Sequence, residues 1–128
     1  MFKQASEKRV AVFVAPGLEE IEGLTVVDLL FRAGIPCDTV AITPERTVTS
    51  SHEVTIVCKR SLFDEDFSFD DYDMLVLPGG IPGTPNLRAC APLCEELAAR
   101  AEGCQLFAKL SPLQKQRVVS VLREQGGH

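Results

Sequence analysis

The stretch RVAVFVAPGLEEIEGLTVVDLLFRAGI (9–35) decides the fold of this chain of 128 residues. Its first part, 9–15, is a continuous run of apolar and β-branched residues, which is the pattern of a central strand covered on both faces. After the turn at Pro16-Gly17, apolar residues recur at three- and four-residue steps and predict a helix over 18–33. Gly34 is placed to end that helix in a left-handed conformation. The stretch therefore predicts a strand, a turn and a helix.

The same unit recurs along the chain. Strands are predicted at 37–43, 74–80 and 105–110, helices within 81–103 and at 111–125, and a small hairpin over 47–60 that turns near Ser50 to His52. Strands that alternate with helices favour a parallel sheet with right-handed crossovers. We therefore predict an α/β protein, a truncated flavodoxin-like three-layer sandwich with strand order 2-1-3-4 and the hairpin as an accessory edge. Ligands of such sheets bind beyond the carboxyl ends of the strands, here the turns after residues 15, 78 and 110.

Composition excludes several classes of protein. The length fits one domain, 1–128, and 45% hydrophobic residues suffice for one core. A formal net charge of −5 argues against a broad nucleic-acid-binding surface, which would need clustered Lys and Arg. No apolar run approaches the roughly 20 residues that span a bilayer, and no secretory signal pattern is present. We therefore expect a cytoplasmic protein that binds neither nucleic acid nor membrane.

The five cysteines are an odd number in a chain with an intracellular composition, so we expect thiols rather than a disulfide framework. Cys90 and Cys94 lie four residues apart on a predicted helix and could be two metal ligands. No CxxC pair and no nearby histidine completes a tetrahedral set, so small buried helix residues explain them better. The sequence predicts neither a metal site nor a cofactor.

Two segments, 9–35 and YDMLVLPGGIPGTPNL (72–87), carry specific motifs. These are a Gly-x-Glu-Glu-x-Glu turn, an Asp-x-x-x-x-Ala-Gly helix end and a Leu-Pro-Gly-Gly strand end. With them, residues 8–103 resemble the ThiJ/PfpI superfamily, in particular its parkinsonism-associated deglycase and glyoxalase-like branch.

The resemblance implies a catalytic thiol site. Glu22 would hydrogen-bond a nucleophilic cysteine, and the backbone amides of Gly79 and Gly80 would stabilise an oxyanion. The cysteine is expected at the end of the next strand, where this chain has Lys109. Cys104 stands near the start of that strand, too far away to replace it. The resemblance therefore implies a vestigial site with no catalytic residue.

The segment QLFAKLSPLQKQRVVSVLREQG (105–126) is similar to part of the phosphorylation domain of P-type cation ATPases. This second resemblance implies that Lys115 matches a lysine that contacts a phosphoryl group. The phosphate-accepting Asp-Lys-Thr-Gly-Thr motif is absent after the first strand. An adventitious anion near Ser111, at the start of the last predicted helix, would be unsurprising.

From both resemblances we predict an engineered chimera without enzymatic activity, in which a ThiJ/PfpI part (1–103) is joined to an ATPase part (104–128) near residues 102–105. One alternative is a shortened natural paralogue that acts as a binding module. A less favoured alternative is a glyoxalase- or deglycase-type enzyme, in which Lys109 could itself be a nucleophile. We also expect a homodimer, by pairing of the helix within 19–31, by pairing of edge strands, or by exchange of the terminal strand and helix.

Overall fold

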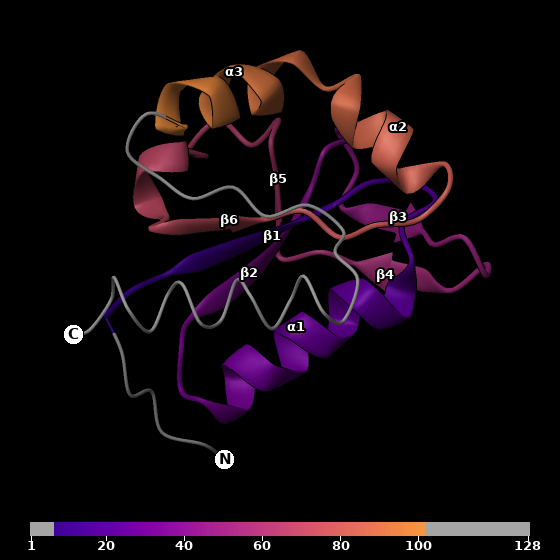
Figure 1. Cartoon of the computed structure of the whole chain (residues 1–128), viewed down its shortest axis with the longest axis horizontal. Coiled ribbons are helices and arrows are strands. Elements are labelled where there is room, and N and C mark those ends of the chain that lie inside the picture. The colour runs from indigo at the N-terminus through magenta and orange to yellow at the C-terminus, as the bar shows by residue number, and fades with distance from the viewer. Residues whose placement is uncertain (1–6, 102–128) are drawn as a thin grey trace.

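A parallel sheet with helices on both faces forms the centre of the molecule in a computed structural model that describes residues 7–101 (Figure 1). The sheet has the order β5-β2-β1-β6, with β1 at Val10–Val14, β2 at Cys37–Ala41, β5 at Arg60–Ser61 and β6 at Met74–Val76. Every residue of β1 is buried, because the strand has a neighbour on each side and helices above and below. The order β2-β1-β6 confirms the first three strands of the predicted topology, and the predicted fourth strand at 105–110 lies outside the described residues.

The helices divide between the two faces of the sheet. Helix α1 (Glu20–Arg32) covers one face, and α2 (Gly83–Arg88) and α3 (Ala91–Arg100) cover the other (Figure 1). Helix α1 begins two residues later than predicted, because the Glu19 side chain caps it by accepting a hydrogen bond from Ile21 N at 2.9 Å. Gly34 has a φ of 74°, so the predicted left-handed helix end is confirmed.

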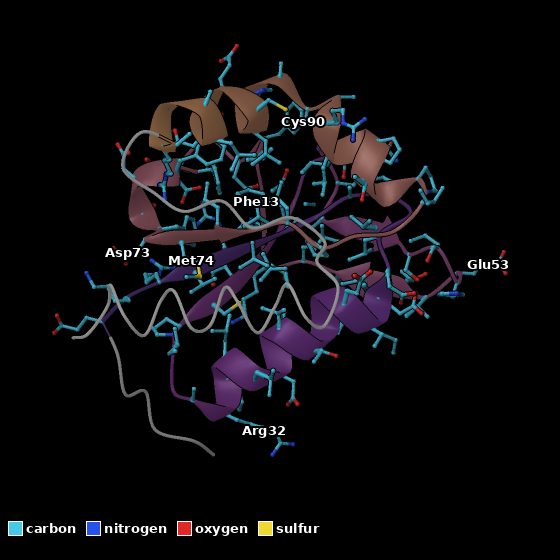
Figure 2. The ribbon with its side chains drawn as sticks, viewed as in Figure 1. Phe13, Arg32, Glu53, Asp73, Met74 and Cys90 are labelled. Carbon is cyan, nitrogen blue, oxygen red and sulfur yellow. The ribbon has the colours of Figure 1, made fainter. Side chains whose placement is uncertain are left out.

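The predicted hairpin is confirmed in part. Strands β3 (Thr47–Thr49) and β4 (Thr55–Val57) are antiparallel, and the turn between them contains His52 and reaches its tip near Glu53, labelled in Figure 2. A buried cluster that includes Val14, Val48 and Ile56 packs the hairpin against the sheet. The hairpin is therefore fixed beside the carboxyl ends of the central strands.

The prediction was wrong at residue 60, which belongs to the central sheet and not to the hairpin. Arg60 and Ser61 pair in parallel with Val40 and Ala41 of β2. Ser61 is fully buried, and its hydroxyl donates to the carbonyl of Thr43 at 2.5 Å. A strand of only two polar residues shows no alternation of apolar and polar side chains, so the sequence pattern did not predict it.

The main core lies between the sheet and the helices α2 and α3. Phe13 of β1, labelled in Figure 2, packs in one cluster with Leu87 and Leu93, and its ring centroid lies 5.9 Å from that of Phe69 in the 3-10 helix η1 (Phe69–Asp71). Within residues 7–101, no helix has the length and hydropathy needed to cross a membrane.

The four cysteines of the described range are free thiols, as predicted. Burial raises the pKa of Cys37 to about 11, with Asp38 adding to the shift, and burial also raises the pKa of Cys58. Cys90 packs against the main core, and Cys94 Sγ lies 3.2 Å from the carbonyl of Arg88, which accepts its hydrogen bond. These contacts agree with cysteines that pack as small side chains.

Candidate functional site

Three loops meet beyond the carboxyl ends of β1 and β6, as the topology predicts for two of them. They are the turn 15–19 after β1, the loop 77–83 after β6 and the hairpin turn 49–54. Backbone hydrogen bonds join them: Glu19 N donates to Gly79 O at 2.8 Å, Gly83 N to Gly17 O at 3.0 Å, and Gly17 N to Thr49 O at 2.9 Å. The predicted ligand-binding edge is thus a connected set of loops.

Two glycines of these loops have no room for a side chain. Gly17 has a φ of 85°, and a Cβ there would lie 2.3 Å from Cδ of Pro82. Gly80 has a φ of 120°, and its Cβ would lie 2.3 Å from the backbone nitrogen of Glu19. Both positions combine a left-handed conformation with close backbone approach, so the contact between the loops depends on glycine.

Glu22 and Gly79 lie against each other. Glu22 is in the first turn of α1, and a Cβ on Gly79 would lie 2.9 Å from Oε2 and 3.2 Å from Oε1 of its carboxylate. The first loop contact explains this, because the bond from Glu19 N to Gly79 O holds the start of α1 at the end of β6. We call this arrangement of Glu22, Gly79 and Gly80 the Glu22–Gly79 corner.

The backbone N–H groups of Gly79 and Gly80 are the candidate hydrogen-bond donors of the corner. The carbonyls of Gly79 and Gly80 are engaged, since they accept from Glu19 N at 2.8 Å and Thr84 N at 2.9 Å. Within residues 7–101, the N–H groups of Gly79 and Gly80 donate no hydrogen bond to the backbone carbonyls of the neighbouring loops. A carboxylate beside amide donors suits a ligand that carries both a hydroxyl group and an electronegative oxygen.

The structure adds a cluster that the sequence did not predict. His52 Nδ1 lies 2.7 Å from Oε2 of Glu20 and 3.8 Å from Oε2 of Glu19, so the hairpin turn is paired with the start of α1. The Ser50 hydroxyl lowers the pKa of Glu20, and His52 adds to that effect. No local pattern could reveal the pair, because Glu20 and His52 are 32 residues apart.

One ligand atom from each residue of this cluster lies within 4.8 Å of the others, a spacing that a divalent cation could use. The 2.7 Å contact between His52 and Glu20 is already a hydrogen bond, and the His52 side chain is 63% exposed. We interpret the cluster as a set of polar contacts that hold the hairpin turn against the start of α1. The other predicted residues, Lys109, Ser111, Lys115 and Cys104, lie outside the described residues.

Comparison with known proteins extends the motif resemblance to most of the chain. The model of the DJ-1/PfpI family matches residues 8–110. This range runs past the predicted junction at 102–105 and includes the position of Lys109.

Individual relatives agree with the family match. The Parkinson disease protein 7 homolog of Danio rerio is 34% identical over 96 residues, which are 75% of this chain and 50% of that protein. The glutathione-independent glyoxalase DJ-1 of Schizosaccharomyces pombe is 36% identical over 85 residues, covering 62% of this chain and 44% of that protein. A crystal structure of a DJ-1 superfamily protein from Salmonella typhimurium superposes with a TM-score of 0.69 at 34% identity, over 77% of this chain and 52% of that one.

The chain therefore spans about half the length of these relatives. The range matched by the family model includes the segments that build the Glu22–Gly79 corner. On these grounds the chain belongs to the DJ-1/PfpI family.

Proposed function

We propose that the chain is a non-catalytic member of its family that binds a small carbonyl compound, or its hydrate, at the Glu22–Gly79 corner. The observation that supports this most is the contact of the Glu22 carboxylate with Gly79, where a Cβ would lie 2.9 Å from Oε2. A hydroxyl of the ligand would donate to Glu22, and its carbonyl oxygen would accept from the glycine amides.

The absence of catalysis follows from the residue at the predicted nucleophile position. A thiolate attacks a carbonyl readily at neutral pH, whereas a lysine does so only where burial lowers its pKa. The sequence has Lys109 where the resemblance implies a cysteine. Loss of a nucleophile lowers a rate by several orders of magnitude, while the binding groups of the site can remain.

An enzymatic role is the competing proposal, and the name of the fission yeast relative, a glyoxalase, favours considering it. Consumption of methylglyoxal by the unmodified chain tests it. We expect no rate above the uncatalysed background, and we expect Lys109→Cys to raise the rate if Glu22 and the amides are positioned for a thiol. Turnover by the unmodified chain that Glu22→Gln abolishes would establish an enzyme and contradict this proposal.

The chimeric origin is a hypothesis about residues 104–128. It rests on the similarity of 105–126 to P-type ATPases, with Lys115 as a former phosphate contact. The family match reaches residue 110 and so includes part of that segment, which favours a natural paralogue over a join at 102–105. The proposed binding at the corner holds for either origin, because Glu22, Gly79 and Gly80 all precede the junction.

A homodimer remains part of the proposal. Helix α1 exposes 68% of Ile21, 39% of Leu24 and 59% of Leu29, an apolar set that a second copy could cover. The mass in solution, measured by light scattering at micromolar concentration, tests this. A mass twice the 14.0 kDa of one chain supports a dimer, and a strictly monomeric mass refutes it.

A further inference from the structure

Glu19, Glu20 and His52 bring three metal-binding side chains together, because the hairpin lies beside the first turn of α1 (Figure 1). His52 Nδ1 lies 2.7 Å from Oε2 of Glu20 and 3.8 Å from Oε2 of Glu19. Zinc binds nitrogen and oxygen ligands at about 2.0–2.2 Å, so two ligands of one tetrahedral ion lie about 3.4 Å apart. The two separations bracket that value, and small side-chain rotations bring all three ligand atoms to one ion.

Hydrogen bonds fix the two segments that carry these side chains. Ser51 N donates to Leu18 O at 2.8 Å. These two residues directly precede His52 and Glu19, so the backbones that carry both ligands are joined. The Glu19 side chain is oriented as well, because its Oε1 accepts a hydrogen bond from Ile21 N at 2.9 Å. Ligands held in this way lose little conformational entropy when an ion binds.

Glu20 supplies independent evidence that a partner is missing from the cluster. Its side chain is only 13% exposed, and its Oε1 is buried without a hydrogen-bond partner among residues 7–101. Its other oxygen, Oε2, contacts His52. Buried carboxylates in proteins are normally satisfied by hydrogen bonds, by a paired cation or by a metal ion. The Glu20 carboxylate therefore has an unmet requirement for positive charge.

The charges of the cluster also call for a cation. Glu19 and Glu20 bring two negative charges, and their ion pairs within residues 7–101 are with His52. A protonated His52 balances one of these charges, and a neutral His52 balances neither. A divalent ion bound by two carboxylates and a neutral imidazole makes the site neutral, which favours binding by groups that are partly withdrawn from water.

The types of ligand select the ion. Imidazole suits zinc, copper, iron and nickel, and carboxylates suit manganese as well. Calcium and magnesium prefer sites made of oxygen ligands alone. Two carboxylates and one imidazole therefore favour a divalent transition-metal ion, with water at the remaining positions.

We propose that Glu19, Glu20 and His52 bind one divalent transition-metal ion, such as Zn²⁺ or Mn²⁺, which joins the hairpin turn to the start of α1. In the ion-free chain the hydrogen bond between His52 and Glu20 holds the same two segments together, and the ion replaces that bond. The site shares no residue with the Glu22–Gly79 corner.

Titration of the ¹⁵N-labelled chain with Mn²⁺ tests the proposal by NMR, because this paramagnetic ion broadens the signals of nearby amides. We expect saturable broadening that is strongest at Ile21, Ser51 and His52. Zn²⁺ is diamagnetic and binds nitrogen and oxygen sites more tightly than Mn²⁺, so an excess of Zn²⁺ should restore these signals. The same excess of Ca²⁺ should not restore them.

His52→Gln and Glu20→Gln each remove one ligand of the ion. Loss of even an outer-shell partner costs a metal site about 10–100-fold in affinity, so each variant should bind Mn²⁺ at least tenfold more weakly. Glu53→Gln is the matched control, because Glu53 is an exposed glutamate of the same turn that does not belong to the cluster. It should bind Mn²⁺ as the unmodified chain does.

Thermal unfolding gives a second measurement, since an ion that binds the folded chain raises its unfolding midpoint as the ion concentration rises. The unmodified chain and Glu53→Gln should show this rise with Mn²⁺, and His52→Gln should not. The proposal is overturned if Ile21, Ser51 and His52 are not broadened, if His52→Gln or Glu20→Gln binds Mn²⁺ as tightly as the unmodified chain, or if Ca²⁺ displaces Mn²⁺ as well as Zn²⁺ does. Failure of ligand binding at the Glu22–Gly79 corner would leave all of these results unaffected.

Discussion

Substitution of Gly80 by alanine tests the contact between the loops that builds the Glu22–Gly79 corner. Gly80 has a φ of 120°, a conformation that costs an L-residue about 1–3 kcal/mol. Its Cβ would also lie 2.3 Å from Glu19 N and 2.8 Å from Gly17 O, and backbone atoms cannot rotate away. Relief of this overlap by a backbone shift costs about 1–3 kcal/mol more. We therefore expect a loss of about 2–6 kcal/mol in the free energy of unfolding, out of a typical total of about 5–15 kcal/mol.

Urea denaturation followed by circular dichroism measures this loss. Gly79→Ala is the matched control, because its Cβ would meet the flexible carboxylate of Glu22, 2.9 Å away, and not backbone. Rotation of that side chain costs about 0.5–1.5 kcal/mol, and the cost should disappear in a Glu22→Ala background. If Gly80→Ala loses less than Gly79→Ala, the described contact between the loops is wrong.

Three further predictions concern titrating groups. Burial and the hydrogen bond from the Tyr72 hydroxyl to Asp38, at 2.7 Å, raise the pKa of Tyr72. The folded chain should therefore lose stability above about pH 10, where Tyr72 ionises in the unfolded state. Urea denaturation midpoints measured across this pH range should fall less for Tyr72→Phe than for the unmodified chain. Alkylation of Cys37, followed by mass spectrometry, should become fast only as the pH approaches its pKa of about 11, and fast reaction at pH 8 would contradict its burial. Ser50→Ala should raise the pKa of Glu20 in a carboxyl NMR titration, because the Ser50 hydroxyl is the largest cause of its lowering; an unchanged pKa would refute that effect of Ser50.

Much of the fold was predictable because local patterns determine it. The apolar run of β1, the helical period of α1 and the left-handed Gly34 each follow from residues close together in the sequence. Strand β5 was not predictable, since Arg60 and Ser61 owe their strand conformation to pairing with β2 and to the buried hydrogen bond of Ser61. Tertiary contacts determine the conformation of β5, and such contacts cannot be predicted from the local sequence pattern.

Part of the candidate site was likewise predictable from the sequence, and part was not. Motifs singled out Glu22, Gly79 and Gly80, and parallel topology predicts that loops after neighbouring strands meet. The pairing of His52 with Glu20 required the packing of the hairpin on the sheet.

We propose above all that the Glu22–Gly79 corner binds a small carbonyl compound. Calorimetric titration with dihydroxyacetone, which carries hydroxyl groups for Glu22 and a carbonyl oxygen for the amides, tests it most directly. We predict saturable binding that Glu22→Gln weakens at least tenfold, with Glu95→Gln, an exposed glutamate on α3, as the unaffected control. Absence of saturable binding to the unmodified chain, or equal binding by Glu22→Gln, would contradict the account.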